Sequence, residues 1–304
     1  MKHAFLIGAY KNPLYLESLI NSLDSEKSNI YVHVNAESWI QFKYLATKYQ
    51  AKSNVHFLHD IKVLWGGSSL LQSIILLIRS ALQEKDNQVF HLITGQDILI
   101  KPLSELFAFF DGNPNNYLSW LLPNDDIYSF ENGGLGRYNY YLLFDTFNCR
   151  NPNIFTKLNH IVLMIQRSVG FHRSEMKITP IYGGSSWWSL QRNALEYFIT
   201  TYEQLKLGKR LAHTFAPDEM IFQTILLNSS KGFKLVNDNL RYMVWKAGAP
   251  GPKTLMLEDF VNITKSSAFF ARKVDPEYSA ELILKINSFT NDKKWQVLNR
   301  SAKI

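Results

Sequence analysis

Residues 1–10 read Met-Lys-His-Ala-Phe-Leu-Ile-Gly-Ala-Tyr, and the apolar run in this stretch decides the class of fold. The run stops at Gly8, too early for the apolar core of a signal peptide, and no small-residue cleavage site follows it. A short apolar run of this length is typical of a buried strand. We therefore predict a buried strand over Ala4–Ala9 at the start of the chain.

Strand and helix patterns alternate from this first strand to about residue 125. Further strands are expected at Ile30–Val34, Val55–Leu58 and Val89–Ile93, and helices at Pro13–Leu23, Ser38–Tyr49, Ser68–Leu82 and Leu103–Phe110. Strands that alternate with helices in this way form mostly parallel sheets. The sequence therefore predicts an α/β fold with a Rossmann-like, mostly parallel central sheet flanked by helices.

Small or polar residues stand at the ends of three of these expected strands. The first ends in Gly8-Ala9-Tyr10, the second in His33-Val34-Asn35, and the fourth in Thr94-Gly95-Gln96-Asp97. Ligands of such sheets bind at the carboxyl ends of the strands. We therefore expect these three strand ends to outline one ligand-binding crevice.

Length and composition favour one domain of enzyme size. The chain has 304 residues, of which 46% are hydrophobic, and this is enough to bury a large core. We expect a single domain over residues 1–304. Its nucleotide-binding half is expected at about residues 1–125, and its acceptor-binding and catalytic half at about residues 126–304.

Charge and cysteine content narrow the expected partners and the expected compartment. The net charge of +7 favours anionic partners such as nucleotides, acidic glycans or a negatively charged membrane surface. No nucleic acid is expected, because the charges are dispersed apart from the C-terminal third. Cys149 is the only cysteine, which excludes an intrachain disulfide and favours the cytoplasm. The strongest apolar helix, Ser68–Leu82, is too short to span a bilayer.

Two adjacent carboxylates, Asp218 and Glu219, follow Pro217 at a point where an amphipathic helix is expected to begin. A carboxylate with rigid backing is well placed to take a proton from one particular hydroxyl group. Acidic residues in a first turn also commonly do no more than complement the helix dipole. The motif alone leaves both interpretations open.

Cations gather between Arg241 and Lys273, where six Lys or Arg residues stand against two acids, Glu258 and Asp259. Arg presents a planar fork to phosphate oxygens and Lys a mobile point charge, so this segment suits the diphosphate of a nucleotide. A solvated basic face is the other interpretation of the same charge pattern.

Residues 123–153 are rich in turn formers and predict a long functional loop that carries Glu131 and Arg137. Its aromatic and charged residues suit sugar binding, and core packing of the tyrosines is the alternative. The helix expected next, Phe155–Val169, has an apolar face, for which we expect core packing rather than contact with a membrane surface.

The stretch Tyr182-Gly-Gly-Ser-Ser-Trp-Trp-Ser-Leu190 joins a glycine turn to two adjacent tryptophans. In a strand, one indole of such a pair faces inward and the other outward. The inward Trp is expected to pack in the core. The outward Trp would offer a stacking wall to a ligand, which the glycines allow to approach closely.

Blocks along most of the chain resemble those of one known family, the core-2/I-branching β-1,6-N-acetylglucosaminyltransferases, which also contains the peptide O-xylosyltransferases. In the C-terminal half the matching blocks are Tyr182–Leu190, Ala216–Glu219, Trp245–Lys253, Asp259 and Phe270–Lys273. In the N-terminal half they are Ile30–Asn35, Val63–Ser68 and Leu92–Asp97. The resemblance covers about residues 4–276. It depends on the order of the blocks, because no single block is diagnostic.

The resemblance implies a glycosyltransferase-A fold, a UDP-sugar donor and inversion at the anomeric carbon without a divalent metal or other cofactor. The chain contains no Asp-X-Asp motif, the ligand pair expected of a metal-dependent enzyme of this fold. The resemblance also implies that Glu219 is the general base. Two basic side chains would stabilise the leaving diphosphate, Lys273 and either Lys253 or Arg272.

The expected site divides into two sets of residues. Those expected to bind the nucleotide sugar are Gly8, Asn35, Trp65, Gly66, Asp97, Lys253, Arg272 and Lys273. Those expected to bind the acceptor are Glu131, Arg137, Trp188 and Trp245. N-acetylglucosamine is favoured as the sugar, with xylose as the alternative, and the acceptor is expected to be a glycan, lipid-linked or not.

The chain departs from the family pattern in two respects. Its second strand ends in His33-Val34-Asn35, where the family usually has Asp in place of Asn35, which puts the identity of the nucleobase in doubt. The paired cysteines of secreted animal members are absent from the sequence, and we expect no membrane anchor like theirs. Both features would fit a bacterial-type enzyme in the cytoplasm, with peripheral contact at the inner membrane face left open. The rival classes are a glycosidase, a non-catalytic nucleotide- or glycan-binding protein, and a nucleic-acid-binding protein.

Overall fold

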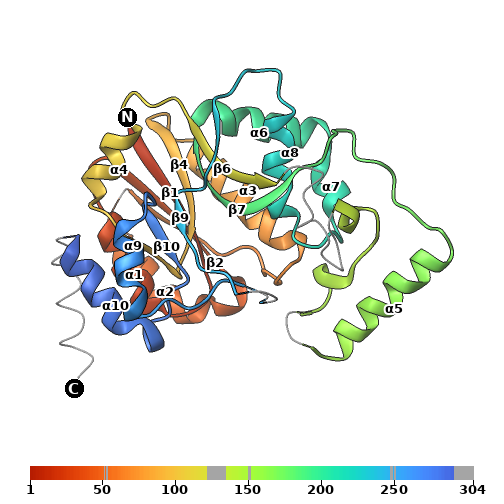
Figure 1. Ribbon diagram of the computed structural model, residues 1–304, viewed down its shortest axis with the longest axis horizontal. Helices are drawn as coiled ribbons and strands as arrows, with labels where there is room; N and C mark the ends of the chain where they lie inside the picture. The colour runs from red at the N-terminus through yellow and green to blue at the C-terminus, as the bar shows by residue number, and fades with distance from the viewer. Residues whose placement is uncertain are drawn as a thin grey trace.

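The computed structural model describes residues 1–50, 52, 54–121, 135–149, 152–246, 249 and 251–290. Its centre is a seven-stranded sheet in the order β3-β2-β1-β4-β7-β6-β8 (Figure 1). The strands are β1 Lys2–Ala9, β2 Ser28–Val34, β3 Val55–Leu58, β4 Asn87–Thr94, β6 Asn116–Leu121, β7 Gly183–Gln191 and β8 Leu235–Asn237. Only β7 runs against its neighbours in this sheet, so the predicted mostly parallel arrangement is confirmed.

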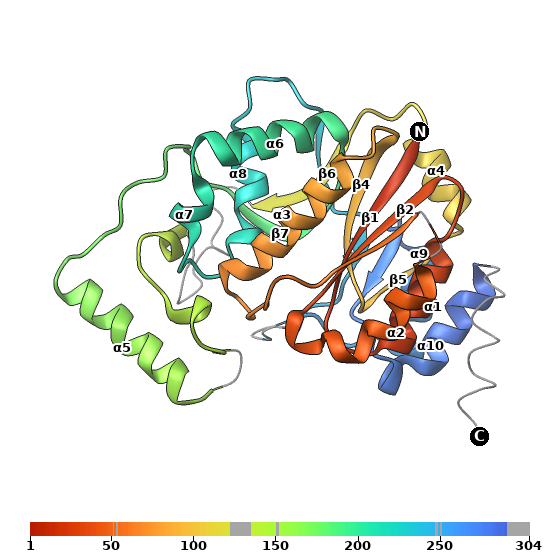
Figure 2. The same cartoon turned by 180° about the vertical axis from the view of Figure 1, so that it is seen from behind.

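Helices cover both faces of this sheet, because alternate side chains of each strand point to opposite sides. Ala4 and Leu6 of β1 pack toward one face, and Phe5 and Ile7 pack toward the other. The first face is covered by α3 (Ser68–Leu82), α6 (Arg192–Gln204) and α8 (Ile221–Leu227), which lie together in Figure 2. The second face is covered by α1 (Pro13–Leu23), α2 (Trp39–Tyr49) and α4 (Leu103–Phe110). The four helices predicted in the N-terminal half are confirmed to within one residue.

A second, three-stranded sheet was not predicted. It has the order β5-β10-β9, with β5 at Asp97–Leu99, β10 at Phe270–Arg272 and β9 at Arg241–Tyr242. Strand β10 is antiparallel to β5, with Arg272 opposite Asp97. It packs with α9 (Phe260–Lys265) and α10 (Pro276–Phe289) around its own apolar cluster. This sheet brings the basic C-terminal segment to the end of β4.

Arg241 joins the small sheet to the large one. Its buried guanidinium donates hydrogen bonds to Ser189 Oγ at 2.8 Å, to Trp188 O at 2.9 Å and to Leu92 O at 3.0 Å. Burial lowers the pKa of Arg241 to about 9. This member of the basic segment is therefore a buried structural residue, since its donors are turned to β4 and β7.

Two further helices, α5 (Ile154–Ser168) and α7 (Leu207–Leu211), belong to the C-terminal half. Helix α5 was predicted at almost the same bounds, but it stands apart from the main body in both views (Figures 1 and 2). Among the described helices, none has the length and apolar character needed to cross a lipid bilayer. The predicted division into two functional halves stays a prediction.

Candidate active site

The carboxyl ends of three parallel strands meet as predicted. Gly8 lies opposite His33 of β2 and opposite Thr94 of β4. The chain beyond each strand continues this contact, since Gly95 N donates to Gly8 O and Asn35 N donates to Ala9 O, both at 2.9 Å. A Cβ added at Gly8 would meet no atom within 4 Å, so the backbone there is open to a ligand.

Asn35, expected to contact the nucleobase, uses its amide within the protein. Its Oδ1 accepts from the backbone N–H groups of Val63 at 3.2 Å and Glu37 at 3.3 Å, and its Nδ2 donates to Val63 O at 3.1 Å. The side chain thus fixes the loop that follows β3. Two lone pairs and one N–H are engaged, which leaves one N–H of Asn35 for a base edge.

Asp218 and Glu219 lie on a short 3-10 turn, Pro217–Glu219, rather than in the first turn of the following helix. The prediction of one continuous helix from Pro217 was wrong, because α8 begins only at Ile221. Ala216 has a φ of 43°, and its N–H donates to Gly66 O at 2.7 Å. This contact ties the turn to the loop that precedes α3.

Arg137 forms an ion pair with Glu219, with 3.2 Å between Nη1 and Oε2. The Glu219 side chain is 44% exposed, whereas that of Arg137 is 13% exposed. Burial against the protein raises the pKa of Glu219, the charge of Asp218 raises it further, and Arg137 opposes both effects. The result is a carboxylate with an accessible side and increased basicity, which suits a general base. Arg137, predicted to bind the acceptor, lies beside the predicted base.

Asp218 is buried and directed away from solvent. Ser186 Oγ of β7 donates to Asp218 Oδ2 at 2.6 Å. Burial raises the pKa of Asp218, and the hydrogen bond from Ser186 opposes that change. Because Asp218 is 2% exposed, it supports Glu219 electrostatically and does not compete with it for an incoming hydroxyl group.

The prediction that Trp188 contacts the acceptor was wrong. Trp188 is completely buried, lies opposite Leu118 of β6 and packs on Phe222, with ring centroids 5.2 Å apart. The half-buried partner of the pair is Trp187, and its ring lies 3.8 Å from the Arg272 guanidinium carbon. The sequence predicted one indole in each direction, and the structure shows which one faces the site.

Gly184, which precedes these tryptophans in β7, serves strand packing. A Cβ at Gly184 would lie 2.1 Å from Ser119 O of β6 and 2.8 Å from Gln223 Nε2. No side chain fits in that space, so Gly184 is required where β7 approaches β6. The expectation that the glycines admit a ligand is replaced by this packing role at Gly184.

Arg272, predicted to bind the diphosphate, lies beside Trp187 and Asp97. It is 9% exposed, stacks on Trp187, and has its Nε 3.6 Å from Asp97 Oδ1. Asp97 is held in turn by Thr94, whose backbone N–H and hydroxyl group both donate to Oδ2. Among the described residues, Arg272 Nη1 and Gln96 Nε2 are buried donors without a hydrogen-bond partner. Such donors suit phosphate oxygens.

The other two basic residues of the predicted donor site differ in their surroundings. Lys253 Nζ lies 2.6 Å from Glu258 Oε1 and 3.0 Å from Asp259 Oδ1, and these hydrogen bonds raise the pKa of Lys253. Two carboxylates therefore already neutralise this ammonium group. Lys273 is half-buried, directly follows Arg272, and accepts a backbone hydrogen bond from Leu255 N at 2.8 Å.

Trp65 and Gly66 pack against Phe215, which leads into the turn that carries Glu219. Trp65 packs edge-on against Phe144 and Phe215, with centroids 6.3 and 5.7 Å apart. Gly66 has a φ of 74°, and a Cβ there would lie 2.6 Å from the Phe215 ring. Both residues support the segment that leads into the Pro217–Glu219 turn, while their predicted contact with the nucleotide stays a prediction.

Asp145 was missed by sequence reasoning, although it organises this region. Its carboxylate accepts from Ser68 Oγ at 2.8 Å and from His213 N at 2.5 Å. It thereby connects the first residue of α3 to the segment that leads into the Glu219 turn. No local motif marks it, because its partners lie about 70 residues away on either side.

The remaining predicted acceptor residues have different outcomes. Trp245 is 59% exposed and has a face that a ligand can stack on. Glu131 lies outside the described residues.

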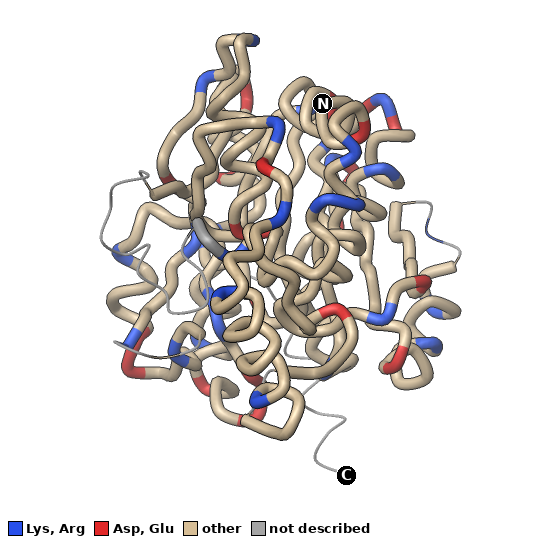
Figure 3. The backbone as a smooth tube through the Cα atoms, turned by 90° about the vertical axis from the view of Figure 1, so that its right-hand side faces the viewer, with Lys and Arg blue, Asp and Glu red and all other residues tan. Residues whose placement is uncertain are grey.

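The described residues also contain no group of three or more His, Cys, Asp or Glu side chains placed to hold a metal ion. In the view of Figure 3, Lys and Arg residues are interspersed with Asp and Glu rather than gathered in one stripe.

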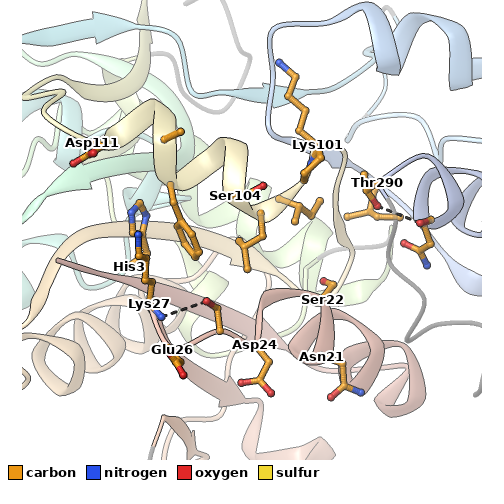
Figure 4. A pocket seen from close by; sticks show the side chains of 18 of the residues that line it. His3, Asn21, Ser22, Asp24, Glu26, Lys27, Lys101, Ser104, Asp111 and Thr290 are labelled. Atoms are coloured by element: carbon orange, nitrogen blue, oxygen red, sulfur yellow. Dashed lines mark hydrogen bonds between the residues drawn. The ribbon is translucent and has the colours of Figure 1, made fainter.

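A cavity lies at the opposite end of β1 from this site. It has a volume of about 1110 Å³ and is lined by His3, Lys27 and Lys101 and by residues of α1 and α4 (Figure 4). His3 and Lys27 stand at the amino ends of β1 and β2. Since ligands of parallel sheets bind at the carboxyl ends, the Glu219 and Arg272 region is the candidate active site.

Comparison with known proteins identifies the family of this chain. The model of the Core-2/I-Branching enzyme family matches residues 3–266, and the chain belongs to this family. With the strand order described above, this membership confirms the predicted glycosyltransferase-A type of α/β fold.

Among curated relatives, xylosyltransferase 2 of Rattus norvegicus is 24% identical over 289 residues, covering 88% of this chain and 31% of the relative. Xylosyltransferase 1 of Homo sapiens is 22% identical over 293 residues, covering 88% of this chain and 28% of the relative. The chain thus spans about a third of the length of the curated relatives it matches. Among solved structures, mouse xyloside xylosyltransferase 1 in its apo form aligns with a TM-score of 0.41 and 13% identity, over 89% of this chain and 97% of that one.

Proposed function

We propose that this protein is an inverting glycosyltransferase that moves a sugar from a UDP-sugar to a hydroxyl group of a glycan acceptor. The observation that carries the proposal is the position of two neighbouring residues of β7. Ser186 holds Asp218 beside Glu219, and Trp187 stacks on Arg272. One strand therefore supports both the proposed base and the cation proposed to receive the leaving group.

Glu219 takes the proton of the acceptor hydroxyl group as that oxygen attacks the anomeric carbon. The bond from the anomeric carbon to the diphosphate oxygen breaks as the new glycosidic bond forms, and the configuration inverts. Arg137 occupies Oε2 of Glu219, so Oε1 is the oxygen that we assign to proton transfer. The raised pKa of Glu219 increases its affinity for this proton.

Arg272 and Lys273 stabilise the negative charge that develops on the leaving diphosphate. We choose Arg272 over Lys253 because the guanidinium has a buried donor without a partner, whereas Lys253 is neutralised by Glu258 and Asp259. Metal independence belongs to the same proposal. It is supported by Asp97, which faces a guanidinium group at the strand end where a metal-binding carboxylate would be expected.

Two donor sugars are candidates. N-acetylglucosamine is the sugar favoured from the sequence, and xylose is favoured by the names of the relatives, which are xylosyltransferases. A panel of UDP-N-acetylglucosamine, UDP-xylose, UDP-glucose and UDP-galactose, with glycan acceptors free and lipid-linked, would decide by mass spectrometry of the product. A cytoplasmic location is also part of the proposal.

The deciding experiment compares Glu219→Gln with Glu105→Gln, a matched change at an exposed glutamate on α4. We expect Glu219→Gln to lower kcat by about 10²–10⁴-fold, the usual contribution of a general base, while UDP binding measured by calorimetry is preserved. Glu105→Gln should leave both unchanged. Turnover should also survive EDTA. Unchanged turnover in Glu219→Gln would remove Glu219 from the mechanism, and loss of activity in EDTA that Mg²⁺ or Mn²⁺ restores would refute metal independence.

A further inference from the structure

Helix α5 shows an apolar stripe to the solvent. Five residues spaced four, three, four and four positions apart form one line along the helix and its C-terminal end. They are Ile154, Leu158, Ile161, Ile165 and Val169, with exposed fractions of 74%, 40%, 53%, 56% and 71%. The expectation that this apolar face packs in the core was therefore wrong.

The opposite face of α5 binds the protein through polar side chains. Asn159 Oδ1 accepts from Leu143 N at 2.8 Å. Gln166 accepts from Tyr141 N and donates to Tyr141 O, both at 2.8 Å. Leu163 is the buried apolar anchor between them. Turning the helix to bury the apolar stripe would break these bonds, so its outward position is fixed by the packing.

The charged residue beside the stripe is basic. Lys157 is exposed on α5 next to the stripe, and the sequence contains no Asp or Glu from residue 154 to residue 174. A second copy of the chain packed stripe to stripe would offer Lys157 no acid of α5 as a partner. An anionic lipid surface instead attracts Lys157 and receives the apolar side chains.

We propose that α5 is an interfacial helix that lies on the surface of an anionic phospholipid bilayer. The stripe from Ile154 to Val169 enters the boundary between headgroups and acyl chains, while Lys157 stays near the phosphate groups. Figures 1 and 2 show that α5 projects from the body of the protein, so a flat membrane surface can reach it. The inference is independent of the proposed reaction, because it concerns a surface away from Glu219.

Vesicle flotation of the full chain tests this inference. Binding is expected to vesicles of phosphatidylglycerol and phosphatidylcholine, to fall with added salt, and to be much weaker to phosphatidylcholine alone. Ile161→Glu should weaken binding to the vesicles roughly tenfold or more, because it removes an apolar group that the bilayer would bury and adds a charge that the anionic lipids repel. Ile40→Glu is the matched control, since Ile40 is 78% exposed on α2, and it should bind like the unchanged protein.

A charge change gives a second, independent measurement. Lys157→Glu should lower binding to anionic vesicles roughly 30-fold, because it changes two charges near the surface at about 1 kcal/mol each, whereas Lys43→Glu on α2 should not. Circular dichroism and thermal unfolding should be unchanged in all four variants. Equal vesicle binding by Ile161→Glu and Ile40→Glu would overturn the proposal. So would a dimer in sedimentation that Ile161→Glu dissociates, since it would assign the stripe to a second copy of the chain.

Discussion

Replacing Arg272 should separate its support of Asp97 from its binding of diphosphate. In Arg272→Ala, the buried carboxylate of Asp97 loses the guanidinium 3.6 Å from it, and Arg241 is the cation that remains near it. Breaking a buried ion pair from one side typically costs about 3–5 kcal/mol. The present pair is 3.6 Å long, beyond hydrogen-bond distance, so we expect a loss of unfolding free energy near the lower end, about 3 kcal/mol. Urea denaturation followed by tryptophan fluorescence would measure it.

The same variant should bind UDP more weakly. Charge-assisted hydrogen bonds contribute about 1.5–3 kcal/mol each, which corresponds to a roughly 10- to 150-fold rise in Kd for loss of one such bond to a phosphate. Isothermal titration calorimetry would measure this change. Lys265→Ala on α9 is the control, because it removes an exposed cation of the same basic segment, and it should alter neither Kd nor stability.

A second substitution decides between the two roles of Arg272. Asp97→Asn in the Arg272→Ala background removes the unpaired charge and keeps an oxygen that accepts from Thr94. Stability should recover by about 2 kcal/mol, the approximate cost of one unsatisfied buried group, while UDP affinity should stay low. If the double variant regained full UDP affinity, Arg272 would act only by holding Asp97, and the reasoning about the diphosphate would be refuted.

Two further predictions concern the turn that carries Glu219. Because burial and Asp218 raise the pKa of Glu219, the acid limb of the kcat/KM profile should lie above the ordinary glutamate pKa of about 4.3. Asp218→Asn should move that limb to lower pH, because it removes one of the two causes. A shift of the limb to higher pH would contradict this assignment. Gly66→Ala should lower the free energy of unfolding by about 2–4 kcal/mol, since it combines a left-handed backbone with a clash on Phe215. Gly112→Ala, with φ of 67° but open space at Cβ, should cost only about 1 kcal/mol in the same urea titration.

The sequence predicted the parts of the fold that local periodicity determines. Helix α3, Ser68–Leu82, was predicted at its observed bounds because its apolar positions recur at helical spacing and turn residues flank it. The small sheet was not predicted, because β9 and β10 have two and three residues, and their pairing joins Arg272 to a partner far away in the sequence. Short strands with distant partners carry little signal of their own.

The candidate site also contains features that the sequence could identify and features that it could not. Glu219 could be identified because Ala-Pro-Asp-Glu is a local motif, and its surroundings agree with the role. The orientation of Trp187 and Trp188 could not, since it depends on the irregular register between β6 and β7, where pairing shifts between Leu118 and Trp120. The outward face of α5 likewise depends on two amide side chains, Asn159 and Gln166, whose backbone partners no sequence pattern identifies.

Arg137 opposes the two effects that raise the pKa of Glu219. Burial and the Asp218 carboxylate favour the protonated form of Glu219, whereas only the ionised form can accept a proton from the acceptor. The guanidinium at 3.2 Å lowers that pKa again. Arg137→Gln should therefore move the acid limb of kcat/KM to higher pH, opposite to Asp218→Asn, with the plateau at high pH largely retained. A loss of activity at every pH, with the limb unmoved, would instead assign Arg137 to binding the acceptor.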